Sequence, residues 1–282
     1  ITSNMGSINH ELVYEFIKIT RLEYQSDLEN LTEIKERLTL LRSQIKNLNI
    51  SGFLVPHSDE FQGEYTPLCS QRLRWITGFS GSAGLSIIFN NKASIFIDGR
   101  YTLQAKEEVD ENCFEILHST HNPLEAWISN NLSLGEKLGF DPKHCSYRLW
   151  SRINKACLSS GGELIPLEYN PIDMIWKKQP PPPLTPTIPH PIVFSGESHS
   201  SKINRIALKL LSEKIDVLVI NSPDSIAWLL NIRGSDVPNT PLSLSFAILY
   251  SNGKVDWFIN KNKLDPKIDK HLGKHTRIRD IN

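Results

Sequence analysis

The sequence predicts an α/β protein made of two tandem copies of a mixed β-sheet flanked by helices. Segments with apolar residues at helical spacing alternate with short continuous apolar runs, which is typical of strands that helices cover on both faces. Two hairpin patterns, one in each half, make the sheets mixed rather than purely parallel. At 282 residues the chain is long enough for two domains, each with its own core.

The first half contains the elements of one such sheet. Apolar residues recur at helical spacing through residues 8–47, and Ser51–Gly52 ends this pattern. A short apolar run at Phe53–Val55, stopped by Pro56, predicts a buried strand. The remaining predicted elements are a hairpin of residues 85–89 and 93–97, helices at 101–109, 123–131 and 147–159, and a strand at 137–140.

A proline-rich break separates the halves. Seven prolines lie between Gln179 and Pro191, and this stretch predicts an extended connector because it can form neither a helix nor a central strand. The order of elements then recurs, with a helix at 200–213, an apolar strand at 216–221 that we expect to be buried, a short helix at 223–230, and a hairpin of 245–250 and 254–259. The predicted domains are an N-terminal helical extension (1–29), a first domain (30–168), and a connector with a second domain (169–282), for which truncation at the C-terminal end stays open.

Matched motifs in the two halves indicate an internal duplication. The spacing from Trp75 to Gly81 equals that from Trp228 to Gly234, and a serine follows each glycine. The hairpin segment 92–98 likewise matches 254–260. We therefore predict two copies of one scaffold, with Trp75 and Trp228 as aromatic residues of the two cores.

Composition excludes several classes of protein. Lys and Arg number 31, as do Asp and Glu, so no net charge draws the chain to nucleic acid or to an anionic membrane. No apolar run reaches the roughly 18–20 residues of a membrane span, and residues 1–9 lack the pattern of a signal peptide. The four cysteines have no metal-site spacing and are expected to be reduced thiols, which favours the cytoplasm. A chain that begins at Ile1 is expected to be a piece of a longer protein.

Two longer motifs resemble one enzyme family. Residues 74–84 (RWITGFSGSAG), with 98–101 (DGRY) after them, resemble the first domain of the three-domain Xaa-Pro aminopeptidases, or aminopeptidases P. Residues 170–176 (NPIDMIW) and 224–236 (DSIAWLLNIRGSD) resemble the second domain, and the similarity runs from about Glu33 to the end of the chain. The resemblance implies the creatinase/prolidase N-terminal fold, a ribonuclease H-like, six-stranded mixed sheet flanked by helices.

The resemblance also implies a chemistry. Family members remove an N-terminal residue that precedes proline, and they act on Xaa-Pro peptides as homodimers. They use two metal ions, usually Mn²⁺, held by two Asp, one His and two Glu of a third, C-terminal domain. The nearest groups in this sequence are His57–Glu60, the pair His118 and His121, and the pair His271 and His275. We interpret these as a polar turn, a surface loop and a solvated tail, so the resemblance places the metal ions in a domain beyond Asn282. This chain is then predicted to hold no cofactor and to be inactive alone.

Other catalytic motifs are weaker. The spacing of Gly78, Gly81 and Gly84 matches neither a Walker loop nor a dinucleotide fingerprint. It predicts a turn in which the backbone approaches closely and takes positive φ.

Four polar residues are candidates for a substrate entrance: Asp98, Arg100, Arg233 and Asp236. Arg100 could project toward a neighbouring catalytic domain and help to bind the peptide. The alternative is structural, with Asp98 capping the helix that follows and Arg100 in an ion pair. For residues 233–236 the alternatives are an interdomain contact and a loop whose Ser and Asp side chains bond to their own backbone.

Three functions stay open at this stage. The first is the N-terminal two-domain region of a cytosolic Xaa-Pro aminopeptidase, which would restrict access to short peptides and build a dimer interface. The second is a non-enzymatic protein-binding module, because the same fold resembles the peptidase-like modules of histone chaperones. The neutral charge and the aminopeptidase-like second domain argue against that class. The third is a truncated regulatory subunit that pairs with full-length chains.

Overall fold

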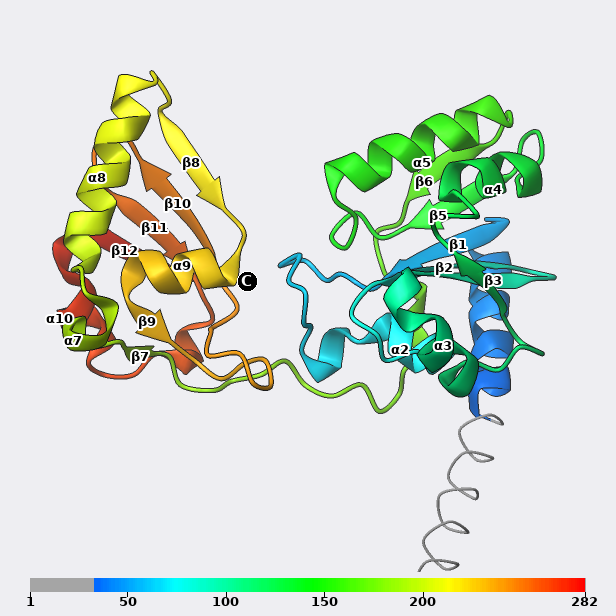
Figure 1. Cartoon of the computed structure of the whole chain (residues 1–282), viewed down its shortest axis with the longest axis horizontal. Helices are drawn as coiled ribbons and strands as arrows, with labels where there is room; N and C mark the ends of the chain where they lie inside the picture. The colour runs from blue at the N-terminus through cyan, green and yellow to red at the C-terminus, as the bar shows by residue number, and fades with distance from the viewer. Residues whose placement is uncertain (1–32, 282) are drawn as a thin grey trace, which may run out of the picture.

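The protein consists of two α/β domains joined by extended chain (Figure 1). The structure, a computed structural model, describes residues 33–281. The helix predicted over residues 8–47 is confirmed for residues 33–47. Its earlier part, and the predicted extension at 1–29, lie outside the described residues.

A six-stranded sheet forms the first domain, with the strand order β4-β3-β2-β1-β5-β6. The central strand β1 is antiparallel to β2 and parallel to β5, and the predicted hairpin and strands are confirmed. Sequence analysis missed β4 and β6, which are short. The bounds are β1 (Gly52–Pro56), β2 (Gly84–Phe89), β3 (Ala93–Ile97), β4 (Glu115–His118), β5 (Lys137–Phe140) and β6 (Glu163–Pro166).

Hydrophobic cores lie on both faces of this sheet. Phe53 and Val55 of β1 join the core that helix 33–47 covers, whereas Leu54, one residue between them, joins the core under two later helices. Those two helices, α4 (Leu124–Asn131) and α5 (Tyr147–Ser159), match the predicted ranges. The other helical elements are η1 (Leu68–Ser70), α2 (Arg72–Thr77), η2 (Gly99–Tyr101), α3 (Thr102–Glu108) and α6 (Pro171–Ile175).

The second domain has a four-stranded sheet in the order β12-β11-β10-β8. The predicted hairpin is confirmed, but the interpretation of the C-terminal region as a solvated tail is wrong. His271 lies on a helix and its Nε2 is 2.9 Å from the carbonyl oxygen of Leu230. The bounds are α8 (His199–Ser212), β8 (Val217–Ile220), α9 (Pro223–Leu230), β10 (Phe246–Tyr250), β11 (Val255–Phe258), η3 (Lys261–Lys263), α10 (Ile268–Leu272), η4 (Gly273–His275) and β12 (Thr276–Arg279).

The predicted duplication is visible in the matching strand order. β12-β11-β10-β8 repeats β4-β3-β2-β1, with the same parallel and antiparallel pairs. A residue with positive φ precedes the first strand of each copy, Asn49 at 54° and Lys214 at 58°. After the hairpin, Asp98 and Asn260 each accept a backbone N–H two residues on and begin a 3-10 turn. The two copies therefore align residue by residue across these elements.

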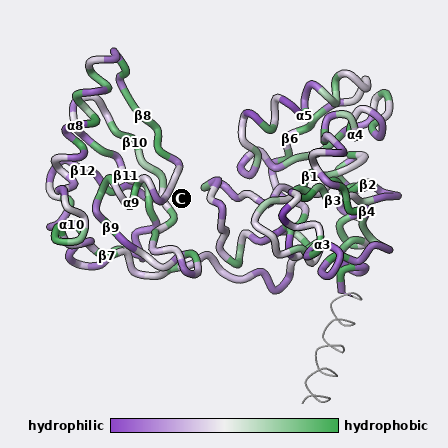
Figure 2. The backbone as a smooth tube through the Cα atoms, in the orientation of Figure 1, coloured by the Kyte–Doolittle hydropathy of each residue, from purple (hydrophilic) through white to green (hydrophobic). Residues whose placement is uncertain are grey.

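Two predictions of burial in the second copy are wrong. β8 is as apolar as predicted (Figure 2), yet Val217, Leu218 and Val219 are 43%, 38% and 66% exposed. Trp228 is 44% exposed, whereas its counterpart Trp75 is half-buried against the ring of Trp176. β8 is exposed because it pairs with β10 alone among the described strands, whereas β1 has a strand on each side. Trp228 is exposed because no aromatic ring among the described residues stacks on it as Trp176 stacks on Trp75.

The connector is anchored at both ends. On the first domain, Gln179 Nε2 donates to the carbonyl oxygen of Cys69 at 2.8 Å. On the second, Thr187 N donates to the carbonyl oxygen of Lys263, and β7 (Ile188–Pro189) pairs with β9 (Ile232–Arg233). Residues 180–186 between these anchors have no regular secondary structure, as predicted, and the short helix α7 (Ile192–Ser195) follows β7.

Direct contact between the domains centres on two aromatic rings. The loop after β1 reaches toward the second domain (Figure 1), and Phe61 stacks on Phe246 with ring centroids 4.8 Å apart. Val237 and Leu244 complete this small core. All four cysteines are free, as predicted. Within residues 33–281 no helix has the length and apolar character needed to cross a membrane.

Candidate functional site

The polar loops of the first domain gather at one edge of its sheet. β1, β3 and β5 run in the same direction, so the segments that follow them meet where these strands end. His57 follows β1, Asp98 follows β3 and Asp141 follows β5. Loops at the carboxyl ends of parallel strands are the usual place for binding residues in open α/β sheets.

Asp98 and Arg100 form a local pair on this edge. Asp98 Oδ1 accepts the backbone N–H of Arg100 at 2.9 Å and its Nε–H at 3.0 Å. These hydrogen bonds, first from the backbone and then from the side chain, hold the pKa of Asp98 below its ordinary value. Both side chains are exposed, so the predicted cap and ion pair leave them accessible. Their part in a substrate entrance stays a prediction.

A glycine-rich turn supports this pair. α2 ends at Gly78, whose φ is 83°, and a Cβ there would lie 2.6 Å from the carbonyl oxygen of Glu108. Positive φ is thus confirmed at Gly78 but not at Gly81 or Gly84, where a Cβ would instead crowd the ring of Phe79. That ring meets Tyr101 edge-on at 5.5 Å. The turn therefore fixes the position of the residue next to Arg100.

A cavity of about 540 Å³ opens beside the turn, between the domains. Tyr101 and Ser82 line it, with the Tyr101 hydroxyl 2.8 Å from Ser82 Oγ. Thr66 also lines it, and its buried Oγ1 has no hydrogen-bond partner. The second domain contributes residues 237–240 to the opposite wall. The cavity therefore has a mixed polar and aromatic lining.

Arg233 and Asp236 occupy a different part of the molecule. Arg233 is half-buried on β9, and its Nη1 donates to the carbonyl oxygen of Ile232 at 2.8 Å. Asp236 is buried, where it pairs with Lys263 and accepts the Thr185 hydroxyl and the backbone N–H of Leu244. No hydrogen bond or ion pair within residues 33–281 joins these two residues to Asp98 or Arg100. Their part in a substrate entrance also stays a prediction.

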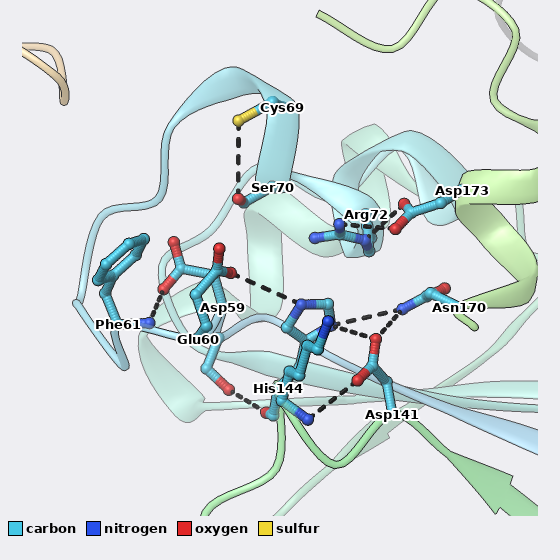
Figure 3. Close-up of polar contacts among 12 residues, drawn as sticks. Asp59, Glu60, Phe61, Cys69, Ser70, Arg72, Asp141, His144, Asn170 and Asp173 are labelled. Carbon is cyan, nitrogen blue, oxygen red and sulfur yellow. Dashed lines mark hydrogen bonds and ion pairs between the residues drawn. The ribbon is translucent and has the colours of Figure 1, made fainter. Parts of the chain in front are cut away.

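Sequence analysis missed a buried polar cluster under the loop after β1 (Figure 3). Asn170 Nδ2 donates to Asp141 Oδ2 at 3.0 Å, and His144 Nδ1 lies 3.2 Å from the same oxygen. Arg72 bonds Asp173 through two nitrogens, at 2.7 and 2.8 Å. These residues come from three separate segments of the chain, so no single local motif contains them all. The N-cap signal of Asn170 before Pro171 was the available clue.

The electrostatics of this cluster follow from burial. Asp59 is buried, and its Oδ1 accepts the backbone N–H of Phe61 at 3.0 Å. Burial, and next the charge of Glu60, raise the pKa of Asp59 to about 6. Burial, and next the charge of Arg72, lower the pKa of His144, which is therefore neutral at pH 7. At pH 7 the cluster therefore holds a neutral imidazole beside the Asp59 carboxyl group, which loses its proton near pH 6.

The residues described do not fit a two-metal site. In residues 33–281 no three or more His, Cys, Asp or Glu side chains group closely enough to hold a metal ion. His57 Nε2 lies 3.0 Å from the carbonyl oxygen of Glu64, and the rings of His118 and His121 are tilted by 44° with their centroids 4.8 Å apart. No metal-assisted step is therefore assigned to these side chains.

Comparison with known proteins identifies both domains. Residues 37–175 and residues 178–282 each match a family model of the creatinase/prolidase N-terminal domain. The chain is 33% identical over 86% of its length to a probable Xaa-Pro aminopeptidase P of Paracoccidioides brasiliensis, and 32% identical over 88% to one of Aspergillus niger. It spans 39% and 41% of the lengths of these relatives.

A solved structure agrees in fold over both domains. The X-prolyl aminopeptidase of Caenorhabditis elegans, described as a cytosolic enzyme with a di-nuclear active site, superposes with a TM-score of 0.83 at 27% identity. The match covers 88% of this chain and 42% of that one. The chain therefore belongs to the creatinase/prolidase N-terminal domain family, as two tandem domains of the kind found in Xaa-Pro aminopeptidases.

Proposed function

We propose that these two domains are the non-catalytic N-terminal region of a metal-dependent Xaa-Pro aminopeptidase, which removes an N-terminal residue that precedes proline. In this proposal the domains restrict which peptides reach the active site and support a homodimer. Two divalent ions, Mn²⁺ by preference, lie in a separate catalytic domain, and the enzyme works in the cytoplasm. The observation that carries the proposal is similarity to the same class of enzyme across both domains in sequence and fold.

The geometry supports a role in peptide access. Arg100 and Asp98 are exposed at the sheet edge, next to Tyr101 in the wall of the 540 Å³ cavity. Asp236 is buried beside residues 237–240 of the opposite wall, so we propose that it positions that wall. Arg233, on β9 before the same loop, would act with it. In this proposal the four residues flank the two walls between which a peptide would pass.

The first test measures catalysis by the chain itself. We expect the purified 282-residue protein, supplied with Mn²⁺, to release no N-terminal residue from an Xaa-Pro peptide above background. The parent enzyme, assayed alongside, should hydrolyse the same peptide and lose activity when chelator removes its metal. Turnover by the 282-residue chain would overturn the assignment as non-catalytic. A metal-independent parent would overturn the proposed enzyme class.

The second test replaces Arg100 with alanine in the parent enzyme. We expect kcat/KM for an Xaa-Pro peptide to fall about fivefold, the effect of roughly 1 kcal/mol from one exposed charged contact. Metal content should not change, because the proposed metal ligands belong to a separate catalytic domain that does not include Arg100. Arg152→Ala is the matched control, since Arg152 is also an exposed arginine paired with a carboxylate, that of Glu125. Equal kinetics in the two variants would remove Arg100 from the entrance.

A further inference from the structure

The proline-rich connector presents an exposed segment with a strong conformational preference. Residues 180–186 have the sequence PPPPLTP. Proline fixes φ at about −65° and carries no N–H, and a residue that precedes proline is restricted to extended backbone. Residues 179–182 and Thr185 each precede a proline, and the segment contains neither helix nor strand. Its local chemistry therefore favours the polyproline II helix, which has three residues per turn.

The edges of this segment have different surroundings. With three residues per turn, residues three apart in the chain lie on the same edge. Pro180 and Pro183 are half-buried and line a cavity of about 770 Å³, which residues of both domains also line. Pro181 and Leu184 are exposed and do not line that cavity, and Pro182 is exposed as well. One edge therefore faces the protein, and the edge with Pro181 and Leu184 faces solvent.

The backbone of the segment is available to a partner. Within residues 33–281 no hydrogen bond engages a backbone group of residues 180–184, so their carbonyl oxygens are free to accept one. The side chains of Gln179 and Thr185 are bonded to the two domains on either side of this run. Because these anchors hold the segment extended before a partner arrives, binding loses less conformational entropy than binding to a flexible peptide would.

Two positive charges lie directly before the segment. Lys177 and Lys178 are both exposed, and neither forms an ion pair within residues 33–281. Unpaired lysines next to a binding segment attract an acidic surface and fix the orientation in which it docks. The connector thus combines an exposed apolar edge, free carbonyl oxygens and an adjacent positive charge.

We propose that residues 177–186 bind a polyproline-recognition domain, a protein module with an aromatic-lined groove and acidic side chains beside it. Grooves of this kind, as in SH3, WW and EVH1 domains, bind proline-rich segments in the polyproline II conformation. Pro181, Pro182 and Leu184 enter the groove, and the two lysines pair with its acidic flank. The bound module is a partner and not a substrate, so this inference does not depend on the proposed peptidase reaction.

Titration with purified modules tests the proposal. The probes are an SH3, a WW and an EVH1 domain, each labelled with ¹⁵N and titrated with the unlabelled 282-residue chain. We expect at least one to bind with a Kd of about 1 mM or lower, with shifts centred on its aromatic groove. A synthetic peptide of residues 177–186 should compete for that groove. Binding by none of the three would overturn the proposal, as would binding to the 282-residue chain but not to the parent enzyme.

Substitutions in the connector separate the two kinds of contact. Pro181→Ala with Leu184→Ala should weaken binding at least about tenfold, because both groove contacts are truncated. Lys177→Ala with Lys178→Ala should weaken it about threefold at low salt and less at high salt. Pro266→Ala is the control, since Pro266 is also exposed and next to a lysine but has no proline near it in the chain. The Tm of each variant should stay within about 1 °C, because these side chains are exposed.

The pattern across the variants decides the outcome. Loss of affinity in both double variants, with the control unchanged, supports the proposal. Equal affinities of the Pro181/Leu184 variant and the control would overturn it. Loss in the lysine variant alone, with no binding left at high salt, would also overturn it and indicate unspecific charge attraction. Synthetic 177–186 peptides with the same substitutions give the same comparison if a variant of the protein is less stable.

Discussion

Asp236→Ala is expected to lower the free energy of unfolding of the second domain by about 3–5 kcal/mol. The Lys263 side chain is 3% exposed, and its ammonium group pairs with the Asp236 carboxylate. Removing the carboxylate leaves a buried ammonium group without its partner, and a buried unpaired charge destabilises far more than an exposed ion pair stabilises. The same change removes the acceptor for the Thr185 hydroxyl, which ties the connector to this domain.

Urea unfolding of three variants tests this expectation. Asp236→Ala, Lys263→Met and the double variant form a cycle, in which the double variant should be more stable than Asp236→Ala because no charge is left buried. Glu125→Ala is the surface control. It breaks the exposed pair with Arg152 and should cost less than about 1 kcal/mol. A cost for Asp236→Ala as small as that of the control would show that water reaches Lys263.

Asp59→Asn is expected to stabilise the first domain at pH 8 and to have little effect at pH 4. The pKa of Asp59 is raised from 3.8 to about 6 in the folded protein, so the folded state favours the protonated carboxyl group. This contribution is fully present below pH 3.8 and is lost as pH rises through 6. This rise in the pKa of Asp59 corresponds to at most about 3 kcal/mol of stability. Asparagine keeps an oxygen for the Phe61 N–H and carries no charge at any of these pH values.

Asp110 supplies a control of opposite sign. Burial alone would raise its pKa, but hydrogen bonds from Asn112 and Cys113 and the charge of Lys35 outweigh burial and lower it. Its stabilising contribution is therefore present above the unfolded pKa and is lost as pH falls, so Asp110→Asn should destabilise at pH 8 and less at low pH. Urea midpoints of both variants, measured from pH 4 to pH 8, show how the effect of each substitution on stability changes with pH. A pH-independent effect of Asp59→Asn would contradict the raised pKa.

Local patterns predicted the elements whose cause is local. The helix at 147–159 has an N-cap serine and an apolar stripe, and the hairpins have apolar runs around a polar turn, so their ranges are confirmed. β12 (Thr276–Arg279) has alternating charged residues and becomes a strand because it pairs with β11. β12 is therefore a strand because of its pairing partner, and the periodicity of its own sequence does not reveal that partner.

In the candidate site, too, local contacts could be predicted from the sequence and contacts between distant segments could not. The Asp98–Arg100 pair spans two residues and follows from capping chemistry, so the sequence could predict it. The cluster of Asp59, Asp141 and His144 is assembled only by the fold, because β1 and β5 are neighbours in the sheet but far apart in the chain. Trp75 and Trp228 have matching sequence contexts and different exposure. The difference depends on Trp176, which no motif around either tryptophan contains.

The proline connector has a mechanical consequence. Between its anchors at Gln179 and Thr185 lie residues 180–184, four of which are prolines. At about 3.1 Å per residue, an extended proline-rich run of this length acts as a rod of roughly 15 Å. Such a run is a semi-rigid spacer that keeps the distance between its two ends nearly constant. A displacement that separates Phe61 from Phe246 would then have to rotate one domain about the ends of this run, because the distance between those ends is fixed.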